Sequence, residues 1–98
     1  MRPCKRIEII VERSHSERVA KLLAGAGAPD YTLIQHAGGH GSRGYRRADD
    51  VTDTDENCIF IVAVEEDSVV SAVIDAVQPA LQRVGGTCLV TEALWTGS

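Results

Sequence analysis

A short segment rich in glycine and arginine carries the residues of this chain whose types and spacing best suit chemistry. It reads Gly38-Gly39-His40-Gly41-Ser42-Arg43-Gly44-Tyr45-Arg46-Arg47. Glycine lets a backbone N–H turn toward a bound oxyanion without a Cβ in the way, and arginine offers a planar donor fork that suits phosphate or carboxylate. The segment therefore predicts an anion-binding loop.

Acidic residues follow the arginines within the same predicted loop. They are Asp49, Asp50, Asp53, Asp55 and Glu56. Carboxylates in a loop are typical of a solvated charged run, with a divalent-metal site as the alternative. A zinc site built from His36, His40 and an acid is a further alternative, although these residues lie in a loop rather than on one face of a helix. Long loops are uncommon in compact domains unless function requires them.

The first half of the chain predicts a strand, a helix and a second strand. Apolar residues alternate over residues 5–12, with Ile10 as an interruption. The S-x-x-E capping box at Ser14 to Glu17 predicts the start of a helix that ends near Gly25 to Gly27. Residues 31–36 then resume as a strand.

The second half repeats this order after the long loop. Residues 57–65 form an apolar, β-branched run that predicts a central strand covered on both faces. Asp67 or Ser68 caps the following helix, which Pro79 should kink or split. Gly85-Gly86 predicts a sharp turn before a strand over residues 87–95.

The resulting order βαββαβ predicts the fold class. It favours an α+β, ferredoxin-like sandwich in which one antiparallel sheet carries both helices on the same face. The other face of the sheet also carries apolar side chains. Because a soluble monomer rarely exposes such a patch, the pattern predicts an oligomer.

Length and composition limit the function classes. A chain of 98 residues predicts a single domain over residues 1–98. The net charge of −4 argues against a nucleic-acid binder, which needs a broad basic face. Cys4, Cys58 and Cys88 form no CxxC pair, which suits a reducing cytoplasm. No apolar run approaches the roughly 20 residues that a membrane span requires, so we expect a soluble cytoplasmic protein.

Residues 30–46, which read DYTLIQHAGGHGSRGYR, resemble the GYT…GGxGSR…R pattern of PII-like signalling proteins. The resemblance is strongest to members tied to inorganic-carbon uptake, namely regulators of a bicarbonate transporter and carboxysome-associated PII-like proteins. It covers roughly residues 5–95, although only the loop motif is distinctive. It implies a homotrimer whose subunits pack sheet against sheet, and adenine-nucleotide binding in the clefts between subunits under a long T-loop, here about residues 38–57.

Carried over residue by residue, the resemblance implies two groups of nucleotide-binding residues. The T-loop base supplies Gly38, Gly39, Gly41, Ser42, Arg43 and Arg46. The turn before the last strand supplies Gly85, Gly86 and Thr87. Nitrogen-sensing PII proteins carry a lysine where Thr87 stands here, and a basic C-terminal segment that this sequence lacks. AMP or ADP is therefore the expected ligand, with cAMP or ATP as further candidates and bicarbonate as a second effector.

The leading hypothesis is a non-enzymatic regulator without a cofactor. Its T-loop would signal to a bicarbonate transporter or a carboxysome-associated partner, without entering the membrane. Two other classes remain as alternatives. One is an enzyme, either a small nucleotide hydrolase or a ferredoxin-like isomerase or monooxygenase, for which we identify no paired base and nucleophile. The other is a copper-tolerance-like trimer that binds metal instead of nucleotide.

Overall fold

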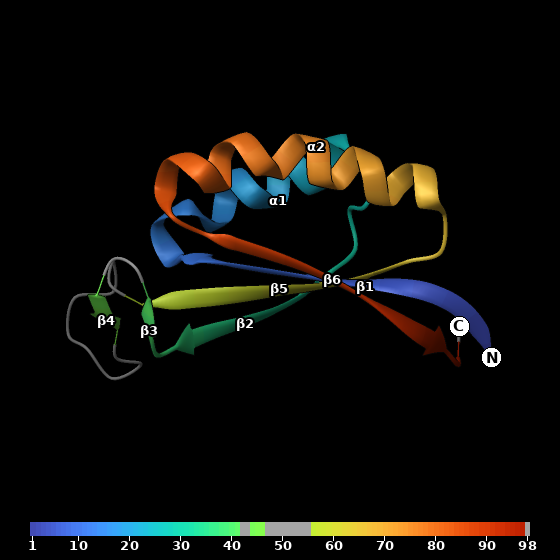
Figure 1. Ribbon diagram of the computed structural model, residues 1–98, viewed down its shortest axis with the longest axis horizontal. Coiled ribbons are helices and arrows are strands. Elements are labelled where there is room, and N and C mark those ends of the chain that lie inside the picture. The colour runs from blue at the N-terminus through green and yellow to red at the C-terminus, as the bar shows by residue number, and fades with distance from the viewer. Residues whose placement is uncertain (42–43, 47–55, 98) are drawn as a thin grey trace.

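The computed structural model describes residues 1–41, 44–46 and 56–97, and for residues 39–41 and 44–46 it describes only the backbone. A four-stranded sheet carries two helices, and a small two-stranded sheet lies beyond one end of it (Figure 1). The elements in chain order are β1 (Arg2–Glu12), the 3₁₀ helix η1 (Arg13–His15), α1 (Ser16–Gly25), β2 (Thr32–Ala37), β3 (Gly39–Gly41), β4 (Gly44–Arg46), β5 (Asn57–Val64), α2 (Asp67–Val84) and β6 (Thr87–Trp95).

The large sheet has the strand order β2-β5-β1-β6, and its neighbouring strands are antiparallel. Both helices lie on the same face of this sheet (Figure 1). The arrangement confirms the predicted α+β, ferredoxin-like fold. Sequence reasoning also placed the last strand correctly, because β6 spans the predicted residues 87–95.

The core lies between the helices and the face of the sheet that they cover. Along β1, Ile7, Ile9 and Val11 point to this face and are at most 2% exposed. Other core residues come mainly from β5, α1 and α2, and they include Cys58, Phe60, Val62, Val64, Val19, Leu23, Val70, Val73, Val77 and Leu81. Burial of each such aliphatic or aromatic side chain stabilises the fold by about 1.5–3 kcal/mol. The alternation of apolar residues along a strand therefore determines which of its faces meets the helices.

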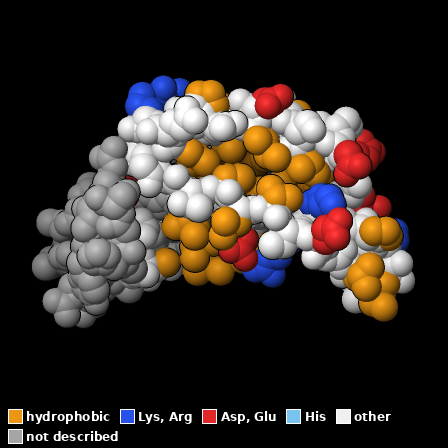
Figure 2. All heavy atoms as spheres, in the orientation of Figure 1, with side chains coloured by type: hydrophobic (Ala, Val, Ile, Leu, Met, Phe, Trp, Pro, Cys, Tyr) orange, Lys and Arg blue, Asp and Glu red, His pale blue; other side chains and the backbone are white. Residues whose placement is uncertain are grey.

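The opposite face of the sheet carries a row of isoleucines. Ile10 of β1 pairs in register with Ile59 of β5, and Ile59 pairs with Ile34 of β2. Ile34 is 44% exposed and Leu89 of β6 is 50% exposed. Figure 2 shows hydrophobic side chains at the surface on the side of the sheet away from the helices. Ile10 therefore interrupts the alternation of β1 because it belongs to this second apolar surface.

Three sequence predictions about local structure are wrong. The helix side of β5 is buried, but Ala63 on its other face is exposed, so β5 is not covered on both faces within one chain. Ser14 lies in η1 and caps nothing, since α1 has His15 as its N-cap without a side-chain bond. Likewise α2 begins after Glu66, whose carbonyl accepts the amides of Val69 and Val70, and no side chain caps it.

Of the two predicted effects of Pro79, a kink or a split of the second helix, the split does not occur, since α2 runs as one helix through this residue. Val77 before the proline and Leu81 after it are both buried in the core. Their burial holds the two parts of the helix on the same apolar stripe and offsets the hydrogen bond that proline removes. The helix ends as predicted at the glycine turn, where Gly85 adopts a left-handed conformation with φ of 83°.

Gly86 provides a test of this packing. A Cβ built on Gly86 would lie 2.7 Å from Val11 Cγ1 and 2.9 Å from the carbonyl oxygen of Ile10. Because backbone must move to make room, we expect Gly86→Ala to lower the free energy of unfolding by about 1–3 kcal/mol in urea denaturation. Gly25→Ala is the matched control, since a Cβ there meets nothing within 4 Å. Equal stability of the two variants would contradict this account.

Candidate functional site

The register of the sheet brings the two predicted halves of the site to one end. At this end Glu12 of β1 pairs with Asn57 of β5, which pairs with Ala37 of β2. On the other side of β1, Ile10 pairs with Thr87 of β6. The base of the long loop and the glycine turn therefore lie at the same end of the sheet, next to the small β3–β4 sheet in Figure 1.

The predicted residues of the loop base are only partly described. Gly38 is exposed and follows β2, whereas Gly39 and Gly41 belong to β3 and Arg46 to β4. His40 pairs in register with Tyr45 between these two short strands, within a segment that the sequence predicted as loop. Ser42 and Arg43 lie outside the described residues, as do Asp49, Asp50, Asp53 and Asp55 of the acidic run.

The glycine turn has its backbone donors already engaged. The N–H groups of Gly85 and Gly86 both donate to the carbonyl oxygen of Leu81, at 2.8 and 3.1 Å. These bonds close the C-terminus of α2 around the left-handed Gly85. The exposed Thr87 follows directly, and its hydroxyl is the polar side-chain group that this turn offers to a ligand.

A histidine–glutamate pair at the loop base was not predicted. His36 Nδ1 lies 2.5 Å from Glu56 Oε2, and the Glu56 carboxylate side chain is only 4% exposed. The backbone carbonyl of Glu56 also accepts the N–H of Arg13 at 2.8 Å. Sequence reasoning had assigned Glu56 to the solvated acidic run, and a separation of 20 residues gave no spacing signal for the pair.

The metal alternatives gain no support from the described residues. Within residues 1–38 and 56–97, whose side chains are described, no group of three or more His, Cys, Asp or Glu residues is arranged to hold an ion. His36 contacts Glu56 instead, and the side chain of His40 lies outside the described set.

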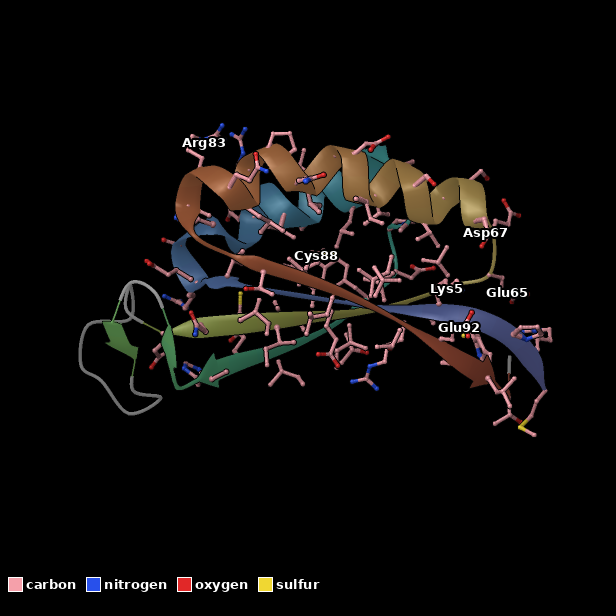
Figure 3. The ribbon with its side chains drawn as sticks, viewed as in Figure 1. Lys5, Glu65, Asp67, Arg83, Cys88 and Glu92 are labelled. Carbon is pink, nitrogen blue, oxygen red and sulfur yellow. The ribbon has the colours of Figure 1, made fainter. Side chains whose placement is uncertain are left out.

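Two hollows lie at the opposite end of the sheet, where the sequence predicted no site. Figure 3 shows Lys5, Glu65, Asp67 and Glu92 near this end. The larger hollow, of about 550 Å³, is lined by these residues together with Pro3, Cys4, Ala93 and Leu94. The second, of about 440 Å³, lies beside the loop of residues 27–30 and Trp95, and the Arg2 guanidinium stacks 5.4 Å from the Trp95 ring centre.

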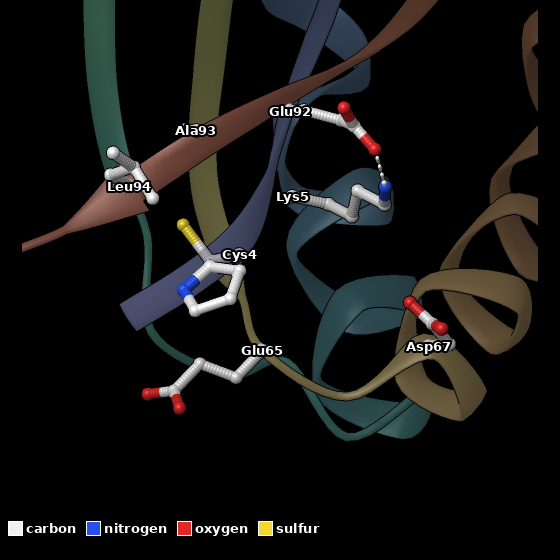
Figure 4. A pocket seen from close by; sticks show the side chains of 8 residues that line it. Cys4, Lys5, Glu65, Asp67, Glu92, Ala93 and Leu94 are labelled. Carbon is white, nitrogen blue, oxygen red and sulfur yellow. Dashed lines mark hydrogen bonds and ion pairs between the residues drawn. The ribbon is translucent and has the colours of Figure 1, made fainter. Parts of the chain in front are cut away.

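The larger hollow holds an exposed ion pair rather than a reactive centre. Lys5 Nζ lies 2.8 Å from Glu92 Oε1, and Figure 4 shows the dashed contact between them, with Asp67 on the neighbouring helix. The hydrogen bond to Glu92 raises the pKa of Lys5, and the same bond lowers the pKa of Glu92. Because Glu92 is largely exposed, solvent screens the attraction, and such pairs stabilise proteins little.

Comparisons with known proteins fit this geometry. The family model of the nitrogen regulatory protein P-II matches residues 4–94. CPII of Thiomonas intermedia K12, a nitrogen regulatory PII-like protein whose structure was solved with ADP, AMP and bicarbonate, is 30% identical, with a TM-score of 0.81 over 93% of this chain and 86% of that one. A second CPII structure, with ADP and bicarbonate, has a TM-score of 0.79 at 30% identity over the same shares of the two chains. No curated protein matches the sequence.

The chain belongs to the nitrogen regulatory protein P-II family, since the family match covers nearly its whole length. It is a PII-like regulatory protein of the α+β class. The architecture extends to more distant proteins: a DUF3240 family protein of Shewanella baltica OS155 has a TM-score of 0.75 at 14% identity, over 100% of this chain and 98% of that one, which indicates a shared fold alone. Within the described residues, no helix is both long and apolar enough to cross a membrane.

The three cysteines are free thiols. Cys58 and Cys88 allow a test of whether the protein holds a reactive thiol. Burial raises the pKa of Cys58 and Cys88. Because the thiolate is the reactive form, we expect iodoacetamide at pH 8 to label both thiols at least ~10-fold more slowly in the native protein than in urea. Mass spectrometry of the labelled peptides measures these rates. Rapid native labelling of Cys58 would instead indicate an activated nucleophile.

Proposed function

We propose that this chain is a non-enzymatic regulator that binds an adenine nucleotide, preferably AMP or ADP, in the clefts between the subunits of a homotrimer. Bicarbonate acts as a second effector, and no cofactor takes part. The observation that carries the proposal is the convergence of the loop base and the glycine turn at one end of the sheet. The ligands of CPII support it, because that protein was solved with ADP, AMP and bicarbonate.

The proposed binding residues are those that the sequence singled out. Arg43 and Arg46 contact the phosphates, with the Ser42 hydroxyl and the backbone of Gly38, Gly39 and Gly41 beside them. Gly85, Gly86 and Thr87 complete the site from the far side of β1. Since the amides of both glycines already donate to Leu81, the Thr87 hydroxyl is the group expected to bond the ligand there.

The proposed output is a change in the T-loop, about residues 38–57, of a single domain over residues 1–98. Arginines and acidic residues follow one another along this loop, so a bound phosphate competes with the acids for the guanidiniums. The nucleotide thereby selects between loop states that differ in affinity for a bicarbonate transporter or a carboxysome-associated protein. The protein works in the cytoplasm, without nucleic acid and without entering the membrane.

Arg43 gives the direct test of the nucleotide site. Loss of a charge-assisted bond to phosphate costs about 1.5–3 kcal/mol, so Arg43→Ala should weaken ADP and AMP binding by roughly tenfold or more in isothermal titration calorimetry. Arg18→Ala, on the exposed side of α1, is the matched control and should bind like the wild type. Unchanged affinity in Arg43→Ala would remove the proposed phosphate contact. Steady phosphate release from ATP or ADP by the pure protein would instead identify a hydrolase.

The open sheet face gives the test of the trimer. Apolar burial yields about 25 cal/mol per Å², and Leu89 and Ile34 are half exposed on the face that the neighbouring subunits would cover. We therefore expect Leu89→Glu to shift the protein from a trimer, near three times 10.5 kDa, to smaller species in light scattering. Glu17→Gln, on α1, should leave the mass unchanged. A wild-type monomer would overturn the intersubunit site.

A further inference from the structure

Glu56 is unusual in its burial. Its side chain and backbone together are 3% exposed. Among the residues whose burial the structure describes, Glu56 is the one charged residue that is buried. Desolvating a carboxylate is costly unless a partner and hydrogen bonds compensate it. His36 supplies the partner through Nδ1, at 2.5 Å from Oε2. The pair joins the end of β2 to the residue just before β5, and it therefore ties together the two ends of the long loop.

The backbone of His36 is held in an uncommon conformation. Its φ is 61°. Among the non-glycine residues that the structure describes, His36 is the one whose φ is positive. The pairing of β2 with β5 also shifts register between Ile34 and Ala37, so His36 lies in an irregularity of the strand. A left-handed conformation costs a non-glycine residue about 1–3 kcal/mol, and such strain gathers at binding sites. Glycine adopts this conformation without a steric penalty, and among other residues histidine, asparagine and aspartate adopt it most often.

The pair leaves one ring nitrogen of His36 available for a ligand. Nδ1 is used by Glu56, while 58% of the His36 side chain is exposed. The second nitrogen, Nε2, lies on the other side of the ring. A carboxylate that bonds one imidazole nitrogen fixes the ring orientation and prepares the other nitrogen for a ligand. With protons on both nitrogens, the ring donates Nε2–H to an oxyanion.

We propose that Glu56 positions His36 so that the imidazole Nε2 contacts an oxyanion at the loop base, two residues from Gly38. The oxyanion is a phosphate group of the adenine nucleotide or a bicarbonate ion, both of which present acceptor oxygens. This inference rests on the proposed function for the identity of the ligand. It adds His36 as a binding residue and Glu56 as a positioning residue, and neither is among the nucleotide-binding residues predicted from the sequence.

Calorimetry with AMP, ADP and bicarbonate, each titrated alone, tests the contact and identifies its source. The variants are His36→Asn, which suits the positive φ but cannot reproduce the imidazole, and Glu56→Gln, which keeps the size of the buried side chain. We expect roughly tenfold or greater weakening of the contacted oxyanion in His36→Asn, and a smaller loss in Glu56→Gln. Weakening of AMP and ADP assigns the contact to phosphate, and weakening of bicarbonate alone assigns it to that ion. The controls are His15→Gln and Glu92→Gln, which should bind like the wild type.

Nitrogen-15 NMR of histidine-labelled wild-type protein measures the Nε2 chemical shift of His36. If the pair were only structural, an added oxyanion would leave this shift unchanged. Addition of inorganic phosphate, bicarbonate or ADP should shift the Nε2 resonance of His36 and leave that of His15 in place, and Glu56→Gln should reduce the shift. An unmoved Nε2 resonance with all three oxyanions, together with unchanged affinities in both variants, would overturn the inference. If the wild type binds no nucleotide but phosphate or bicarbonate shifts Nε2, the proposed nucleotide function fails while the oxyanion contact stands.

Discussion

The candidate site depends on the placement of β1 between β5 and β6. Ile7, Ile9 and Val11 must face the helices, and a slip of one residue would turn all three to the opposite face of the sheet. Their burial therefore fixes the register that sets Glu12 beside Asn57 and Ile10 beside Thr87. The loop base and the glycine turn are far apart in the sequence, and they meet at one end of the sheet only because this strand holds both neighbours in register. The packing of Gly86 against Val11 and Ile10 locks the same end.

The second face of the sheet combines apolar and charged side chains in a way that bears on assembly. Arg6 Nη2 lies 2.7 Å from Glu8 Oε1, and this pair stands beside the row of Ile10, Ile59 and Ile34. In a single chain the pair is solvated and stabilises little, since the Arg6 side chain is 47% exposed. In the proposed trimer, in which neighbouring subunits cover this face, the same charges must be desolvated together, which costs less when each already has its partner. The apolar row then supplies the attraction, and the ion pair limits how the faces can align.

Periodicity was sufficient to predict most of the fold, because burial on one face imposes a repeat that the sequence displays. Glycine signals placed two boundaries correctly, because α1 ends at Gly25 and β6 follows the Gly85-Gly86 turn at residues 87–95. Local capping signals failed, because Ser14 was taken into a 3₁₀ turn and Glu66 caps α2 with its backbone alone. Pro79 does not split α2, since tertiary burial on both sides of it outweighs the local preference of proline to end a helix. The His36–Glu56 pair could not be predicted from the sequence, because the two residues are 20 positions apart and no local pattern around either one indicates the contact.

The two halves of the candidate site, the glycine turn and the loop base, differ in which groups they offer to a ligand. At the glycine turn the amides of Gly85 and Gly86 already donate to the last turn of α2, so the group that this half offers to a ligand is the Thr87 hydroxyl. At the loop base, Gly38 is exposed and His36 is held by a buried carboxylate. Under the proposed function, a ligand that bridges the halves meets the glycine turn on one side and the loop base on the other. Binding energy gained against the glycine turn can then select a state of the loop, which is the physical requirement for the proposed signalling through that segment.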